Sequence, residues 1–322
     1  MIAYFIHCHR RLDRVRRLLQ WLYSPRDLYL VGVDVTGAEC VDLGQLAGLP
    51  RNVVVRRLPP TVWGGASMLT ATLEAMAAAL AADRDWRWFV NLSGQDIPLK
   101  PQDAILSTLE GERRAGRTNF VATYGARPFA PTVAIDATVT ETQMLQRHAD
   151  VAFVLYGQAR ALFAADAQAN FEPGQRASLF VSEDFARKQL HLRPLGRAER
   201  TMRARFFAAT PFRFGRLWQV ASRELCTYAV GDDAAYRLLG TLGTCFIPEE
   251  SFFQMLVADA PADRVGTTVS DNLRYRRGAP HVLHDGLLPA LRSDPALFAR
   301  KLEFGRCAAI DRWIDEEIAP RR

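Results

Sequence analysis

The first third of the chain alternates between two hydrophobic patterns. Short apolar runs rich in β-branched residues, IAYFIHC, LYLVGVDV and NVVVRRL, are typical of buried strands. Between the first two runs, apolar residues recur at helical spacing from about residue 10 to residue 23. The alanine-rich segment ASMLTATLEAMAAALAA predicts a second helix, and WRWFVNLSG predicts another buried strand. This alternation predicts an α/β fold with a mostly parallel central sheet flanked by helices.

The remaining two thirds are less uniform. From about residue 129 to residue 211 the sequence is rich in arginine, and we expect loops and helices over the sheet, with helical patches near FVSEDFARKQLHL and RAERTMRARFF. Further on, WQVASRELCTYAV predicts a strand leading into a helix, PEESFFQMLVADA a helix, TTVSDNLRYRR a strand and CAAIDRWIDEEI a closing helix. Because no linker rich in Gly, Pro and Ser divides the chain, we expect a single domain over residues 1–322.

Composition excludes several classes of protein. With 322 residues, 49% hydrophobic and 24% charged, the chain can bury a substantial core. The opening run IAYFI is short and has no basic region before it, which indicates a strand and not a signal peptide. No apolar run reaches the roughly 20 residues of a membrane span. We therefore expect a cytoplasmic protein without a transmembrane segment, with peripheral attachment to a membrane as the alternative.

Cysteine spacing and net charge add little to the functional picture. The five cysteines are scattered and never spaced as Cys-x-x-Cys, so neither a disulfide framework nor a zinc site is predicted. The net charge of +6 is compatible with an anionic ligand, a membrane surface or nucleic acid, but the basic residues are spread along the chain. Charge alone therefore leaves open a non-catalytic basic protein that binds nucleic acid or an anionic glycan.

The segment PEE, residues Pro248, Glu249 and Glu250, raises a question of chemistry. Proline in a first turn followed by acids is a common helix start, where each carboxylate complements the helix dipole by about 0.3–1 kcal/mol. A single carboxylate can also serve as a general base. On their own, these residues are compatible with either role.

Five segments in a fixed order resemble one enzyme family: TVWGGASML, FVNLSGQDIPL, PEESFFQML, DNLRY and LFARKLE. Together they are similar to the inverting glycosyltransferases of family 14, which comprise core-2/I-branching β-1,6-N-acetylglucosaminyltransferases and peptide O-xylosyltransferases. The resemblance implies a GT-A-type fold and a UDP-sugar donor. It also implies that residues 1–125 form the nucleotide-sugar-binding half, and that residues 126–322 form the acceptor-binding and catalytic half.

The resemblance further implies catalysis without a metal or another cofactor, because the family dispenses with the Asp-x-Asp metal site. The only Asp-x-Asp of this chain, Asp83 to Asp85, precedes the strand WRWFVNL and is typical of a solvated turn. Cations must then neutralise the departing UDP. The resemblance assigns that role to Arg300 and Lys301, although an isolated ARK segment would be interpreted as a surface charge pair.

The resemblance also gives one acid of PEE a catalytic role. It implies that Glu250 takes the proton from the acceptor hydroxyl in a single inverting displacement, for which one carboxylate suffices. Glu249 stands where the family often has aspartate. We expect its carboxylate to complement the dipole at the helix start and to lie at the edge of the donor or acceptor site. Two further residues are assigned to this edge, Trp218 and Arg274, and core packing explains Trp218 equally well.

The remaining candidates would bind the donor. Trp63, Gly64 and Gly65 would lie beside it, although WGG alone also fits a packed tryptophan in a turn. Asp34 resembles an aspartate near the uracil and ribose, but Val35 replaces the family's basic residue and leaves the base contacts open. Asp96 follows a buried strand and would bind the sugar or hold a cationic side chain. Two more candidates match a His-x-Arg pattern, His9 and Arg11, and a structural role explains His9 equally well.

The expected activity is transfer of N-acetylglucosamine or xylose from a UDP-sugar to a hydroxyl of a glycan or another acceptor, with formation of a β-linkage. WGGASML and PEESFF are closer to the xylosyltransferase branch, but such segments report the shared chemistry better than they report the sugar. The expected partners are the UDP-sugar and the acceptor, and no nucleic acid is expected because aromatic and basic residues are not interleaved as in single-strand binders.

Overall fold

The computed structural model describes residues 1–36, 42–82, 85–127, 176–177, 179–275, 282–302 and 307–320. The strands are β1 Ile2–Cys8, β2 Leu28–Asp34, β3 Val53–Leu58, β4 Trp88–Ser93, β5 Ile97–Pro98, β6 Asn119–Arg127, β7 Leu179–Asp184, β8 Gln189–Pro194, β9 Phe212–Ser222, β10 Thr268–Val269 and β11 Phe298–Ala299. The α-helices are α1 Leu12–Leu22, α2 Ala66–Ala81, α3 Gln102–Arg114, α7 Arg197–Ala209, α8 Arg223–Gly231, α9 Asp233–Leu242, α10 Phe252–Asp259, α11 Ala262–Val265, α12 Leu288–Ser293 and α13 Ala308–Trp313.

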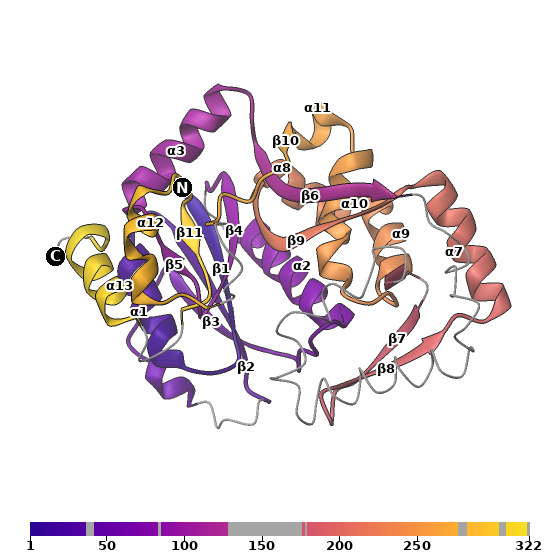
Figure 1. Cartoon of the computed structure of the whole chain (residues 1–322), viewed down its shortest axis with the longest axis horizontal. Helices are drawn as coiled ribbons and strands as arrows, with labels where there is room; N and C mark the ends of the chain where they lie inside the picture. Colours follow the sequence, from indigo (N-terminus) through magenta and orange to yellow (C-terminus); the bar gives the residue numbers. More distant parts are fainter. Residues whose placement is uncertain are drawn as a thin grey trace.

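A seven-stranded sheet forms the centre of the fold, in the order β10-β6-β9-β4-β1-β2-β3 (Figure 1). Neighbours among β4, β1, β2 and β3 pair in parallel, and β10 is parallel to β6. Strand β9 is antiparallel to both β4 and β6. The predicted α/β fold with a mostly parallel sheet is therefore confirmed, and β9 joins the later part of the chain to the sheet of the first part.

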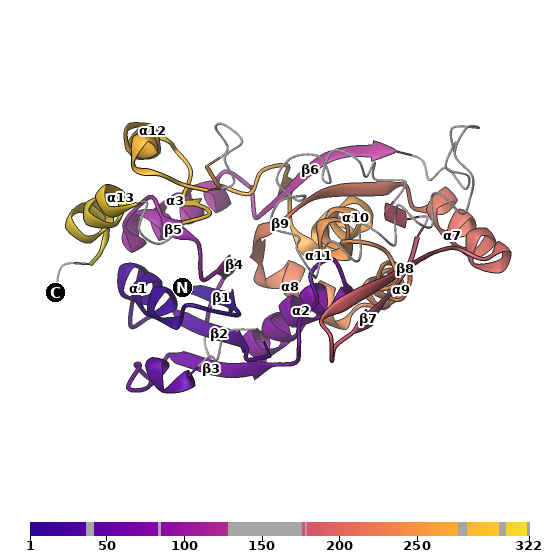
Figure 2. The ribbon, with the colours of Figure 1, turned by 60° about the horizontal axis from the view of Figure 1, so that its bottom comes forward.

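Helices cover the sheet on both faces (Figure 2). Alternate side chains of β1 point to opposite layers: Tyr4 and Ile6 belong to a core shared with α1, α3 and α13, whereas Ala3 and Phe5 belong to a core shared with α2, α8 and α10. Because both faces are covered, β1 is apolar at nearly every position and does not alternate between apolar and polar residues. The continuous apolar run IAYFI reflects this double burial.

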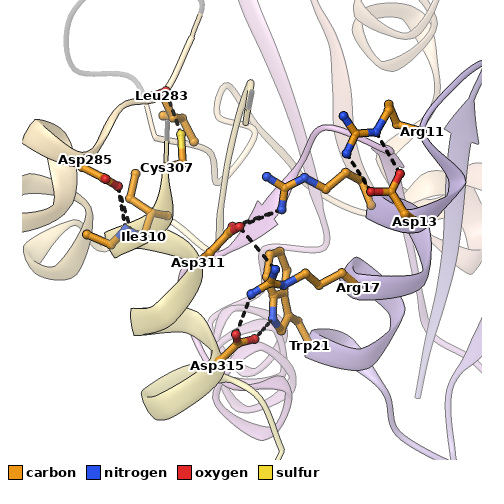
Figure 3. Close-up of polar contacts among 12 residues, drawn as sticks. Arg11, Asp13, Arg17, Trp21, Leu283, Asp285, Cys307, Ile310, Asp311 and Asp315 are labelled. Atoms are coloured by element: carbon orange, nitrogen blue, oxygen red, sulfur yellow. Dashed lines mark hydrogen bonds and ion pairs between the residues drawn. The ribbon is translucent and has the colours of Figure 1, made fainter. Parts of the chain in front are cut away.

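The C-terminal helix packs against α1 through charged contacts (Figure 3). Arg14 and Arg17 on α1 both pair with Asp311 on α13, at 2.9 Å and 3.4 Å. One turn further, Asp315 accepts hydrogen bonds from Trp21 Nε1 at 2.7 Å and from Arg17 at 2.6 Å. These contacts join α13 and the turn after it to the first helix of the chain.

Two expectations about secondary structure were wrong. The segment FVSEDFARKQLHL forms the antiparallel hairpin of β7 and β8 and not a helix, because Leu179, Val181, Leu190 and Leu192 bury one face with a period of two residues. The helix-forming residues Ala186, Arg187 and Lys188 of this segment fall at its turn. In TTVSDNLRYRR, only the two residues of β10 form a strand, and residues 276 and 277 lie outside the described part of the chain.

Other predicted elements agree with the structure. Segment WQVASRELCTYAV provides the end of β9 and the start of α8, RAERTMRARFF provides most of α7, and CAAIDRWIDEEI provides α13 and a following π-helical turn, Ile314–Ile318. PEESFF begins as a 3₁₀ turn, Pro248–Glu250, that leads into α10. Within the residues described, none of the helices combines the length and the apolar character needed to cross a bilayer.

Candidate active site

Asp96 lies in the turn after β4, at the carboxyl end of the parallel strands, and is buried. One carboxylate oxygen, Oδ2, accepts hydrogen bonds from Ser93 N at 2.7 Å and from Ser93 Oγ at 2.6 Å. The other oxygen, Oδ1, accepts from Arg274 Nη1 at 3.0 Å, and Arg274 Nη2 donates to the carbonyl of Asn91 at 2.6 Å. Asp96 therefore holds a cationic side chain, which is one of the two roles expected for it.

Trp218 on β9 lies beside a buried arginine, Arg274, and a half-buried one, Arg300. The Cζ atom of Arg300 is 4.0 Å from the centre of the Trp218 ring, and that of Arg274 is 5.5 Å from it. Both distances are within the range of cation–π attraction. Burial lowers the pKa of Arg274 to about 10, although Asp96 opposes the shift, so this arginine stays charged at neutral pH. The tryptophan thus acts as a platform for two guanidinium groups.

Arg300 is the less satisfied of these two arginines. Its Nε atom is buried and finds no hydrogen-bond partner among the described residues. Burial lowers the pKa of Arg300, Asp96 opposes that shift, and the nearby Arg216 adds to it. An arginine that is buried and incompletely paired favours an anion beside it. Asp96 therefore interacts with two arginines, Arg274 and Arg300, and Arg216 adds further positive charge beside Arg300.

The ARK segment is attached directly to the turn that carries Asp96. Strand β11 pairs antiparallel with β5, and Leu302 N donates to the carbonyl of Gln95 at 2.8 Å. The carbonyl of Lys301 accepts from Leu283 N at 2.8 Å, and its side chain is partly exposed. The structure thus brings together Asp96, Trp218 and the ARK segment, which are far apart in the sequence.

Asp34 ends β2 at the same edge of the sheet and is completely buried. Its oxygens accept from Lys188 Nζ at 2.6 Å, from Thr61 N and Oγ1 at 2.9 Å and 2.7 Å, and from Thr36 N and Oγ1 at 3.0 Å and 2.5 Å. Burial by itself would raise the pKa of Asp34, but these hydrogen bonds, led by that from Lys188, hold it well below its usual range. Asp34 is thus an ionised carboxylate that organises its neighbours.

Lys188 is a further candidate site residue, which the sequence did not indicate. It lies in the turn of the β7–β8 hairpin with a φ of 53°, and it places a cation beside Asp34. The residue after Asp34 is the apolar Val35, where the resemblance leads one to expect a basic residue. Positive charge beside Asp34 comes instead from Lys188, 154 positions further along the chain. Only the hairpin topology reveals this pairing, because no motif surrounds Lys188.

The end of β1 contributes one buried and two exposed polar side chains. His7 is largely buried, its Nε2 lies 3.4 Å from Thr61 Oγ1, and burial followed by the charge of His9 lowers its pKa to about 4. His7 is therefore neutral at pH 7. His9 is exposed, and Arg11 pairs with Asp13 at 2.7 Å on the exposed side of α1 (Figure 3). The buried histidine, His7, was not among the candidates.

The WGG segment contacts the residues that precede PEE. Ile247 N donates to the carbonyl of Gly64 at 2.8 Å, and the Trp63 ring meets the Phe246 ring edge-on with 5.8 Å between centroids. Gly64 has a φ of +80°, and a Cβ atom there would lie 2.9 Å from the Phe246 ring. Glycine is required by conformation and by space at this position. Gly64 thus allows the chain before Glu250 to pack against the start of α2.

Gly65 leaves room for an acid from the hairpin. A Cβ atom on Gly65 would lie 2.2 Å from Oε1 of Glu183, which is far inside contact distance. Glu183 accepts a hydrogen bond from Ser67 N at 3.2 Å and another from Ser67 Oγ, so it caps the amino end of α2. A cavity of about 200 Å³ lies beside it, lined by Thr61, Thr70 and Phe185 among others.

The two glutamates of PEE have different surroundings. Glu250 has a side chain that is 27% exposed, and its Oε2 accepts from Arg176 Nη1 at 2.8 Å. Glu249 is 4% exposed, and its Oε2 has no hydrogen-bond partner among the described residues. Burial, reinforced by the charge of Glu250, raises the pKa of Glu249 to about 8. The expected role of Glu249 in charging the helix start is therefore wrong, because a buried and largely protonated acid supplies little charge.

Strand β9 connects the PEE segment to the arginine cluster. Gln254, one turn into α10 after Glu250, donates to the carbonyl of Arg216 at 2.9 Å and to that of Ala122 at 3.3 Å. Arg216 is two residues before Trp218 on β9. Strand β9 therefore both carries Trp218, which contacts Arg300, and binds α10, the helix that follows Glu250.

The Asp-x-Asp segment is described only at Asp85, since Asp83 lies outside the described residues. Asp85 is exposed between α2 and β4, before the amino end of that strand, as predicted. Across the residues that the structure describes, no three His, Cys, Asp or Glu side chains come together as a candidate cation site. Of the predicted candidates, the charged residues Asp96, Arg274 and Arg300 form the most closely connected group.

Comparison with known proteins finds relatives that match part of this chain. Residues 2–139 match the family model described as Core-2/I-Branching enzyme. Over 138 residues the chain is 34% identical to "Xylosyltransferase oxt" of Drosophila pseudoobscura pseudoobscura, which covers 41% of this chain and 15% of that protein. Over 100 residues it is 39% identical to "Beta-glucuronosyltransferase GlcAT14C" of Arabidopsis thaliana, which covers 29% of this chain and 26% of the relative.

A third relative, "N-acetyllactosaminide beta-1,6-N-acetylglucosaminyl-transferase" of Mus musculus, is 30% identical over 113 residues, with 34% of this chain and 28% of that protein covered. The chain thus spans under a third of the length of these curated relatives. The family resemblance drawn from the motifs is confirmed for residues 2–139, which contain Asp34, WGG and Asp96. Glu250, Arg300 and Lys301 lie beyond the matched region.

Proposed function

We propose that this chain is a glycosyltransferase with a GT-A-type fold. It would transfer a sugar from a UDP-sugar to a hydroxyl of a glycan or another acceptor, invert the anomeric carbon and form a β-linkage without a metal ion. The observation that carries the proposal is the match of residues 2–139 to the Core-2/I-Branching enzyme family, and the relatives that the chain matches are glycosyltransferases by name. Those names specify three different sugars, so the identity of the transferred sugar is open.

The contacts within the site support the proposed chemistry. Glu250 would accept the proton of the acceptor hydroxyl while the acceptor oxygen forms its bond to the anomeric carbon. The bond between that carbon and the phosphate oxygen would break on the opposite face, and UDP would leave with the electron pair. Arg300 and Lys301 would stabilise the negative charge that develops on the diphosphate. The buried Nε atom of Arg300, which has no hydrogen-bond partner among the described residues, supports this role.

The donor would lie along the carboxyl edge of β1, β2 and β4. Asp34, at the end of β2, would organise the nucleotide end through the side chains that it holds, and Trp63 would flank the donor beside Gly64 and Gly65. Asp96 would keep Arg274 oriented under Trp218. This arrangement follows the general position of ligands in open α/β sheets.

A donor screen tests the proposal. The chain is incubated with UDP-N-acetylglucosamine, UDP-xylose or UDP-glucuronic acid and a panel of glycan acceptors, and UDP release is monitored. We expect one donor to be consumed in an acceptor-dependent manner, and UDP to raise the melting temperature without added metal. If no donor is consumed and an oligonucleotide raises the melting temperature instead of UDP, the chain is a basic binding protein and the proposal is wrong.

A further inference from the structure

The proposed base is paired with an arginine that lies 74 positions away in the sequence. Arg176 Nη1 donates to Glu250 Oε2 at 2.8 Å, and the arginine side chain is only 7% exposed. This bond engages Oε2, and no hydrogen bond from the described residues engages Oε1, so Oε1 is the oxygen that would meet an acceptor hydroxyl. A carboxylate that is 27% exposed would otherwise sample several rotamers.

Arg176 is held in place by its own backbone contacts. Its carbonyl accepts from Phe246 N at 3.2 Å, directly before the PEE segment. The buried Arg203 on α7 donates to the carbonyl of Ala177 at 2.8 Å and to that of Thr244 at 2.9 Å. The segment carrying Arg176 and the segment leading to Glu250 are thereby joined by one guanidinium group. The ion pair lies on a constrained support, as a positioned catalytic group requires.

The charges around the pair direct the guanidinium to Glu250. Three acids face this region, Glu249 and Glu250 from the PEE turn and Glu183 from the hairpin. Glu183 is engaged by Ser67 at the start of α2. Glu249 is buried and largely protonated at neutral pH. Glu250 is therefore the acid that receives the charge of Arg176.

We propose that Arg176 is a positioning residue that orients the Glu250 carboxylate toward the acceptor hydroxyl. This inference rests on the proposed function. As the acceptor proton moves to Glu250, the carboxylate becomes neutral and its attraction to Arg176 weakens. The benefit of Arg176 therefore comes from orientation before proton transfer and not from stabilisation of charge in the transition state. Misplacement of a reacting group by about 1 Å can cost on the order of a hundredfold in rate.

Two substitutions at this position test the inference, with a matched control. Arg176→Met removes the charge, Arg176→Lys keeps it without the planar fork, and Arg193→Met breaks the exposed Arg193–Glu199 pair nearby. The turnover number, the donor KM and the UDP affinity by calorimetry are measured for each variant. We expect Arg176→Met to lower kcat by about tenfold to a hundredfold with the donor KM within about twofold, Arg176→Lys to recover part of the loss, and Arg193→Met to match the wild type.

The separation of kcat from UDP affinity is a readout that a purely structural residue would not give, because a misplaced base slows the chemical step and leaves the donor site intact. If Arg176→Met and Arg176→Lys keep wild-type kcat, or lose kcat and UDP affinity together, the positioning role is wrong. Should Arg176→Met fail to fold, the same criteria apply to Arg176→Lys. A wild-type chain that binds no UDP and consumes no donor contradicts the proposed function itself.

Discussion

The guanidinium of Arg300 stacks on Trp218 at 4.0 Å, and Trp218 at the same time neighbours Arg274 at 5.5 Å. This relationship joins β9, the ARK segment and the segment DNLRY in one cluster. The buried ion pair between Asp96 and Arg274 holds the Arg274 guanidinium in place beside Trp218. Both arginines have a buried Nε donor without a hydrogen-bond partner among the described residues, and we expect that of Arg300 to face the diphosphate.

Replacement of Arg300 tests the diphosphate site. Arg300→Met should weaken UDP binding by about tenfold or more, because a charge-assisted hydrogen bond contributes about 1.5–3 kcal/mol. Lys301→Ala should weaken it in the same direction. Calorimetric titration with UDP measures both, and Arg26→Met is the control because Arg26 pairs with Asp103 in solvent, where the two side chains are 68% and 89% exposed. Equal affinity in Arg300→Met, Lys301→Ala and the control would remove both residues from the donor site.

The pair of Asp96 and Arg274 predicts a loss of stability. Asp96→Asn leaves Arg274 buried without its counter-ion, and breaking such a pair typically costs about 3–5 kcal/mol. Denaturant unfolding of the variant and the wild type measures the difference. Because Arg274 supports Trp218, UDP affinity should fall as well. A variant as stable as the wild type would show that Ser93 and Asn91 alone hold this turn.

Glu249 predicts a pH dependence of the free energy of unfolding. Its pKa is raised from an ordinary value of 4.5 to about 8 in the folded chain. The stability associated with its protonated form is fully present below the pKa of the unfolded chain and is lost as the pH rises through about 8. Glu249→Gln, which cannot ionise, should therefore lose less stability than the wild type between pH 5 and pH 8. Denaturant unfolding at the two pH values measures the difference, and parallel losses would contradict the burial of this acid.

Removal of metal ions tests the absence of a cofactor. If Arg300 and Lys301 neutralise the leaving group, EDTA should leave UDP release unchanged, and added Mn²⁺ should not increase it by more than about twofold. The assay is the donor screen described above. Loss of activity in EDTA with recovery in Mn²⁺ would show that a divalent ion, and not the ARK segment, carries the charge.

The central sheet could be predicted from the sequence because a strand that is buried on both faces has apolar residues at nearly every position. Such strands are therefore recognisable as short, nearly continuous apolar runs. Motifs and their order gave Asp96, Arg300 and Lys301 as candidate site residues, and the contacts of Asp96 and Arg300 bring two of them together, while their roles stay predictions. Lys188 and Arg176 were missed because each pairs across more than 70 positions with no surrounding motif. The segment that forms the hairpin carrying Lys188 predicted a helix, because the residues at its turn are good helix formers.

Glu249 shows the limit of local reasoning. An acid after proline at a helix start is normally solvated, and only the packing of the PEE turn against its neighbours makes this one buried. The roles of the two adjacent glutamates were therefore distinguishable in sequence only by resemblance. Their different burial is a property of the tertiary structure.

The central claim is that Glu250 is the general base, and one pair of measurements tests it directly. Glu250→Gln keeps the shape of the side chain and removes its ability to accept the proton, so turnover with the preferred donor should fall by roughly 10² or more. UDP affinity by calorimetry should stay within about twofold of the wild type, because Arg300 and Lys301 are unchanged. Turnover close to that of the wild type in a variant that binds UDP normally would contradict the assignment.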